Sequence, residues 1–156
     1  MALAIGISLL FIIFVGVKFQ PPKHSSLMKN NAKSIRAFIG AINFDEYRLF
    51  YQALGFEESR IFDNMSYFSI SPALGFYLQN AYVKDWVDNT MIFVEVENVE
   101  EYFKELQDLG LSEKYKNVRL TPIKVNDWGK ECFLHDPSGV LWHFGEFNQL
   151  QKHEII

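Results

Sequence analysis

The sequence predicts an α+β fold built from two tandem βαβββ modules. Three observations support this prediction: an internal repeat, the same order of apolar and polar stretches in each copy, and a glycine after each predicted helix. The stretch AINFDEYRLFYQALGF (41–56) aligns without a gap with VENVEEYFKELQDLGL (96–111), at an offset of 55 residues. Six of the 16 aligned positions are identical, which favours duplication of one unit.

Each copy begins with an apolar strand that runs into an asparagine, and a helix follows. The predicted first strands are IRAFIGAI (35–42) and MIFVEV (91–96). Acidic residues occupy the first turn of each predicted helix, where they interact favourably with the helix dipole. Apolar residues then recur at helical spacing, and Gly55 and Gly110 end the two helices.

Three further strands follow each predicted helix. In the first copy they lie near 56–62, 66–71 and 75–80, and in the second near 118–125, 131–135 and 139–146. The last strand follows the turn residues of DPSG (136–139) and continues as VLWHF (140–144). Alternation of side chains along this strand predicts that His143 and Trp142 face opposite sides of the sheet.

Composition and charge exclude several classes of protein. The chain has 156 residues, 49% of them hydrophobic, which is a globular composition with room for a real core. Residues 1–44 carry five basic residues and no acid, so the remainder carries 10 basic and 19 acidic residues. An acidic body argues against nucleic acid as a partner. The single cysteine, Cys132, excludes an internal disulfide and is expected to be a small buried side chain.

The N-terminal segment is distinct from the predicted body. Residues 2–17 form 16 uncharged residues in a row, which would span about 24 Å as a helix. Residues 1–27, this apolar segment plus a polar linker, are therefore either a membrane anchor or an upstream extension. The basic residues that follow the apolar run favour a cytoplasmic body, tethered to the membrane if the anchor is real. The predicted domain spans 28–150, with modules at about 34–81 and 90–148 and a polar tail at 151–156.

With two βαβββ modules, helices that end in LGF and LGL, and the DPSGVLWHF strand, the sequence resembles the vicinal oxygen chelate superfamily. That superfamily includes glyoxalase I, extradiol dioxygenases, fosfomycin resistance enzymes and bleomycin resistance proteins. The resemblance covers about 35–147, and FYQALGF and DPSG are its most specific pieces. It implies a curved mixed sheet around a shared open cavity, and a homodimer. Because this fold hosts several chemistries, function has to be inferred from the site.

The resemblance also implies four metal-ligand positions, which in this chain fall on Arg36, Gln79, Met91 and His143, with Tyr77 as a less secure alternative to Gln79. Arginine cannot lose its proton to become a ligand, and a methionine thioether suits soft metals. The sequence therefore predicts no metal site and no cofactor.

Strand alternation predicts which side chains share a face with these positions. Arg36 shares its face with Phe38, Met91 with Phe93 and Glu95, and His143 with Leu141. The predicted ligand-binding residues are therefore Arg36, Phe38, Gln79, Met91, Phe93, Glu95, Leu141 and His143. An apolar cleft with a few converging polar groups is typical of small-molecule sites. The aromatic residues Tyr82, Trp86 and Trp128 are expected in loops, where they would cover a planar ligand or form a dimer contact.

The predicted function is metal-independent binding of a small molecule, anionic or aromatic, as in bleomycin resistance proteins. Two alternatives remain open. One is an enzyme (a lyase, an isomerase or a dioxygenase) in which His143 is a catalytic acid–base group or an atypical metal ligand. The other is a non-catalytic protein-interaction domain.

Overall fold

The computed structural model describes residues 31–148, and the fold occupies residues 34–148 of this range. The apolar segment 2–17 and the tail 151–156 lie outside the described residues. Within the described range, no helix has both the length and the apolar character needed to cross a membrane. The tethering role of residues 2–17 and the cytoplasmic location stay predictions.

The first module contains one helix and a four-stranded sheet. Strand β1 pairs with β4 in parallel, whereas β4 with β3 and β3 with β2 are antiparallel, which gives the order β1-β4-β3-β2. The elements are β1 (Phe38–Gly40), α1 (Phe44–Ala53), β2 (Glu57–Phe62), β3 (Met65–Ser69) and β4 (Gly75–Gln79).

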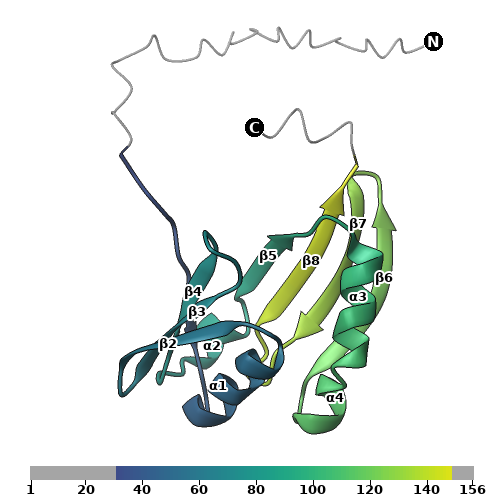
Figure 1. The fold of residues 1–156 in the computed structure, drawn as a ribbon. Helices are drawn as coiled ribbons and strands as arrows, with labels where there is room; N and C mark the ends of the chain where they lie inside the picture. The colour runs from purple at the N-terminus through teal and green to yellow at the C-terminus, as the bar shows by residue number, and fades with distance from the viewer. Residues whose placement is uncertain (1–30, 149–156) are drawn as a thin grey trace, which may run out of the picture. The chain divides into compact units, whose positions relative to one another are not determined.

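The second module repeats this arrangement in a second sheet, of order β5-β8-β7-β6, again with one parallel pair, β5 and β8 (Figure 1). Its elements are β5 (Met91–Glu95), α3 (Val99–Asp108), β6 (Arg119–Asn126), β7 (Gly129–His135) and β8 (Leu141–Phe147), with short helices α2 (Lys84–Val87) and α4 (Leu111–Lys114). The predicted α+β fold and its two βαβββ modules are confirmed. The four strands of each module form a sheet of their own.

The two long helices begin and end at the equivalent residues of the repeat. The side chains of Asn43 and Asn98 accept hydrogen bonds from the backbone N–H groups of Glu46 and Glu101, so each asparagine caps a helix N-terminus. After each helix, Gly55 (φ 95°) and Gly110 (φ 58°) adopt positive φ values that favour glycine. The local signals that predicted the helices therefore also set their limits.

Each sheet has one face covered by its helix and one open face. In β8 the side chains of Trp142 and Phe144 are buried, whereas those of Leu141 and His143 are only partly buried. The same alternation runs along β3 and β4, where Phe68, Phe76 and Leu78 are buried. Figure 1 shows α3 lying against the sheet of the second module. The core therefore lies on the helix sides of the sheets, and the opposite faces are free to form a site.

Aromatic side chains join the two modules into one core. Trp142 is fully buried, and its ring lies 5.8 Å from Tyr51, 5.9 Å from Phe56 and 5.1 Å from Phe76, all three in the first module. Such edge-on and tilted ring pairs stabilise a core beyond the area that they bury. The last strand of the second module is therefore also part of the first module's core.

A buried carboxylate makes a second connection between the modules. Asp136, 1% exposed, begins the turn before β8, and its Oδ1 accepts hydrogen bonds from the backbone N–H groups of Ser138, Gly139 and Val140. Its Oδ2 accepts a hydrogen bond of 2.6 Å from the hydroxyl of Tyr51, 85 residues earlier. Burial raises the pKa of Asp136 to about 6, although the hydrogen bonds to the carboxylate act in the opposite direction.

Candidate functional site

The open face of the first sheet carries an arginine among stacked aromatic rings. The Arg36 guanidinium lies 4.5 Å from the centre of the Tyr67 ring and donates a 3.3 Å hydrogen bond to the Tyr77 hydroxyl. Phe38 stacks on Tyr77 with 4.8 Å between ring centres. The hydrogen bond with Tyr77 raises the pKa of Arg36, and no acidic side chain among residues 31–148 pairs with it. This platform therefore presents a permanent cation beside flat apolar rings.

Four of the predicted ligand-binding residues line one cavity between the modules. Its volume is about 640 Å³, and Arg36, Met91, Phe93 and Glu95 are among its lining residues. Met91 is 66% exposed and Phe93 is 44% exposed, so both present apolar surface to solvent. The cavity has the size of a small-molecule site and brings a cation, a carboxylate and an aromatic ring to one place.

The other predicted residues lie elsewhere. Phe38 and Gln79 line a much smaller cavity of about 60 Å³, together with Trp86. Leu141 and His143 are on the open face of the second sheet, on β8, and line neither cavity. The predicted ligand-binding residues therefore fall into three groups: four line the larger cavity, two line the smaller cavity, and two lie on β8.

His143 is paired with a carboxylate that the sequence analysis did not select. Its Nδ1 lies 3.0 Å from Oε2 of Glu131, which is 7% exposed. The other oxygen of Glu131 accepts a 2.9 Å hydrogen bond from the Asn126 amide. A carboxylate without a proton only accepts hydrogen bonds, so in this contact the Nδ1–H of His143 is the donor, and Nε2 is the ring nitrogen that Glu131 does not contact. A carboxylate-oriented histidine of this kind can act as a general base.

Aromatic rings surround this imidazole. Phe133 approaches the His143 ring edge-on at 4.8 Å, and Phe93 lies 6.3 Å from it. Gly145 leaves room for Phe93, because a Cβ at that position would lie 2.5 Å from the Phe93 ring. Phe93 thus contacts both His143 and the cavity between the modules.

The site contains residues that sequence reasoning missed, notably Glu131, Asn126 and Tyr67. A signal for Glu131 was present: in ECFLH (131–135), alternation puts Glu131, Phe133 and His135 on the same face of β7. Which residue on the neighbouring strand they meet depends on the register, which pairs Phe133 with His143. No local pattern in the sequence indicates that register.

The expected loop aromatics have different environments. Trp128 lies in the turn between β6 and β7 and contacts Phe93 and Phe147, at 6.0 and 5.2 Å between ring centres. Trp86 is 74% exposed but belongs to the short helix α2, so its predicted loop placement is wrong. The pattern KDWV (84–87) is a single helical turn, too short to show helical periodicity in the sequence.

The four positions at which the family resemblance implies metal ligands do not fit a divalent ion. Arg36 keeps its proton and bonds to Tyr77, Gln79 and Met91 line different cavities, and His143 is the one position of the four with an imidazole. Within residues 31–148, no group of three or more histidine, cysteine, aspartate or glutamate side chains is placed to hold a metal ion. Cys132 is fully buried, and burial raises the pKa of its thiol to about 11.

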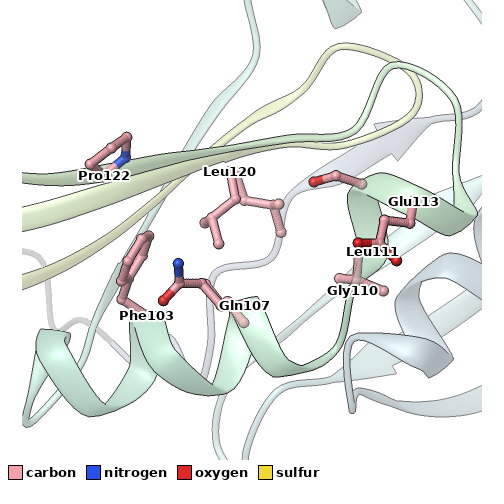
Figure 2. Close-up of a pocket in the computed structure, with 10 residues that line it drawn as sticks. Phe103, Gln107, Gly110, Leu111, Glu113, Leu120 and Pro122 are labelled. Atoms are coloured by element: carbon pink, nitrogen blue, oxygen red, sulfur yellow. The ribbon is translucent and has the colours of Figure 1, made fainter.

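A further cavity, of about 320 Å³, lies between α3, α4 and β6 (Figure 2). Phe103 and Gln107 come from α3, and Leu120 and Pro122 come from β6. Four of its ten lining residues are leucine, and Glu113 is the one charged residue among the ten. It contains none of the predicted site residues and no basic residue, so it is not the candidate site.

No protein-family model matches the sequence, and no curated protein matches it either. Solved structures do share the fold. A bleomycin resistance determinant encoded on the transposon Tn5 aligns with a TM-score of 0.64 and 16% identity, over 75% of this chain and 99% of that one. The bleomycin-binding protein of Streptomyces verticillus, complexed with copper(II)-bleomycin, aligns with a TM-score of 0.60 and 17% identity, over 75% and 99%.

A third structure with this fold is the fosfomycin resistance protein FosX from Listeria monocytogenes, complexed with Mn(II) and sulfate. It aligns with a TM-score of 0.59 and 13% identity, over 82% of this chain and 98% of that one. At these identities the likeness establishes the fold that the sequence resemblance implied. The function depends on the residues that this chain places on the fold.

Proposed function

We propose that this protein binds a small, planar, anionic molecule in the cavity between its modules, without a bound metal ion. The observation that carries the proposal is Arg36, which lines that cavity and has no acidic partner among the described residues. Its guanidinium stacks on Tyr67 and bonds to Tyr77, two rings that are not in the lining themselves. Such a group satisfies its remaining donors with a carboxylate, sulfonate or carbonyl oxygen of a ligand. Phe93 and Met91 supply apolar contacts for the rest of the molecule.

The fold is consistent with this role. Two proteins that share it are a bleomycin-binding protein, with copper(II)-bleomycin bound, and a bleomycin resistance determinant.

Homodimerisation stays a prediction: the exposed aromatic and apolar side chains on the open faces are surface that a second copy would cover. Light scattering of the protein at micromolar concentration measures its molar mass, and the mass of a monomer would contradict homodimerisation.

The test uses 8-anilinonaphthalene-1-sulfonate, a fluorescent aromatic anion, as the probe. We expect saturable binding that weakens about tenfold in Arg36→Ala, because one charge-assisted hydrogen bond contributes roughly 1.5–3 kcal/mol. Arg60→Ala is the matched control, since Arg60 also stacks on a ring, that of Phe44 at 5.0 Å, but does not line the cavity. Equal binding by the unchanged protein and Arg36→Ala would refute the assignment.

Metal independence is tested in the same preparation. After loading with zinc, nickel, iron or manganese and desalting, elemental analysis should find no stoichiometric metal, because the permanent charge of Arg36 repels a divalent ion. About one metal ion per chain, lost in His143→Ala, would restore a metal site and overturn this part of the proposal.

An enzyme is the second candidate function, and the Glu131–His143 pair is the observation that favours it. His143 would act as the general base, and Glu131 and Asn126 would position it. If a ligand is turned over, His143→Gln should abolish turnover while binding persists, and Glu131→Gln should reduce kcat more than it raises KM. Unchanged kcat in His143→Gln would eliminate this candidate.

A further inference from the structure

We propose that a second pocket, at the end of β6 and β7, binds the phosphate group of a small molecule. The pocket has a volume of about 390 Å³ and is lined by Asn117, Arg119, His135, Pro137, Ser138 and Gly139. It shares no lining residue with the cavity between the modules. The proposal therefore does not depend on the proposed function.

Arg119 and His135 offer unused hydrogen-bond donors at this pocket. Arg119 is exposed and forms no hydrogen bond or ion pair through its guanidinium with any residue in 31–148. In His135, Nδ1 is buried without a partner, whereas Nε2 is not among the buried unpartnered atoms. A buried N–H without an acceptor is costly, so the ring proton of the neutral imidazole belongs on Nε2, the nitrogen that remains accessible. Both side chains therefore have donors that no protein group uses within residues 31–148, and a ligand oxygen can take the place of water there.

Asn117 supplies a third polar group from a less common backbone conformation. Its φ is 68°, and it is the one residue other than glycine with positive φ among residues 31–148. Asparagine adopts this conformation more readily than most residues, and non-glycine residues with positive φ are worth testing for a functional role. Here the conformation brings a small side chain with an amide donor to the rim of the pocket.

Local charge favours an anion although the body as a whole is acidic. Residues 114–123 contain Lys114, Lys116 and Arg119 and no acid. The pKa of His135 is lowered, first by burial and then by the nearby Arg119 and His143 side chains. A bound oxyanion would relieve the repulsion from these side chains.

Two acidic residues lie beside residues that line the pocket, and both are already paired. Asp136 is buried, with its carboxylate bonded to Tyr51 and to the turn backbone. Asp88 lies beside Gly139 and forms an ion pair with Lys84. Neither carboxylate is free to occupy the Arg119 guanidinium in place of a ligand.

The donor set favours phosphate over a carboxylate. Arg119 and His135 are paired across β6 and β7, and Asn117 lines the same pocket, so a guanidinium, an imidazole and an amide are available to the several oxygens of a tetrahedral anion. The volume exceeds that of phosphate alone, so there is room for the organic part of a phosphate monoester.

The experiment titrates the full chain with inorganic phosphate and with phenyl phosphate, at constant ionic strength kept with sodium chloride, and follows backbone and arginine N–H signals by NMR. We expect saturable shifts at Gly139 and at the Arg119 side chain. Affinity should fall at least tenfold in Arg119→Gln and also fall in His135→Gln. Lys124→Gln is the matched control, because Lys124 is on β6 but outside the pocket, and it should bind as the unchanged protein does.

Three outcomes would overturn the proposal: shifts that grow linearly without saturation, undiminished affinity in Arg119→Gln, or an equal loss in Lys124→Gln, which would indicate diffuse attraction to a basic surface. Arg36→Ala should bind phosphate normally. If Arg36→Ala loses the aromatic anion and keeps phosphate, the two sites are independent, and either assignment can fail without the other.

Discussion

Replacing Asp136 with alanine should lower the free energy of unfolding by about 3–5 kcal/mol near neutral pH. The carboxylate accepts hydrogen bonds from three backbone N–H groups and from the Tyr51 hydroxyl, and the site is 1% exposed. Alanine would leave these donors buried without an acceptor, and each unsatisfied donor costs about 1–3 kcal/mol before the structure relaxes. Tyr51→Phe removes only the hydrogen bond from the Tyr51 hydroxyl and should lower the free energy of unfolding by about 1–2 kcal/mol.

Urea unfolding followed by tryptophan fluorescence and by circular dichroism measures both variants. Asp63→Ala is the matched control, since Asp63 is also in a turn but is exposed, and it should change stability by less than about 1 kcal/mol. A loss in Asp136→Ala no larger than that of the control would show that the turn and the module contact do not depend on this carboxylate.

Asp136→Asn separates the hydrogen bonds from the charge. The amide oxygen can still accept the three backbone N–H groups, but the side chain no longer ionises. Because the folded-state pKa of Asp136 is raised to about 6, the part of its contribution that depends on protonation is fully present below its ordinary pKa of 3.8 and is lost as pH rises through about 6, whereas the hydrogen bonds that its oxygens accept remain. The unchanged protein should therefore lose stability relative to Asp136→Asn between pH 4 and 7, by on the order of 3 kcal/mol. A constant difference across this range would contradict the raised pKa.

Replacing Trp142 with alanine should lower the free energy of unfolding by about 3–5 kcal/mol, as expected when a fully buried aromatic side chain is truncated. The indole contacts Tyr51, Phe56 and Phe76 of the other module, so the cavity left by alanine would open where the modules meet. The unchanged protein should unfold in one transition that involves both modules, because they share this core.

Trp86→Ala is the control for Trp142→Ala, because the same residue type is removed from a position that is 74% exposed. It should change the urea midpoint little, because surface substitutions usually change the free energy of unfolding by no more than about 0.5 kcal/mol. If Trp142→Ala unfolds at the same midpoint as Trp86→Ala, the aromatic contact between the modules does not stabilise the fold.

Local features of the sequence were enough to predict the two modules. The repeat at an offset of 55 residues corresponds to α1 at 44–53 and α3 at 99–108, and Gly55 and Gly110 follow the two helices as predicted. The alternation of side chains placed Trp142 in the core and His143 on the open face. Capping, glycine at positive φ and strand alternation act over a few residues, so a single sequence contains them in full.

The tertiary structure decided which side chains meet. Glu131 reaches His143 because β7 and β8 pair in one particular register, and Arg36 reaches Tyr77 because β1 lies parallel to β4. The sequence indicates only a turn at Asp136, yet the Asp136 carboxylate accepts a hydrogen bond from the hydroxyl of Tyr51, on a helix 85 residues earlier. These contacts depend on strand register and on how one module packs against the other. Both are set by burial of the whole core, so no short stretch of the sequence contains them.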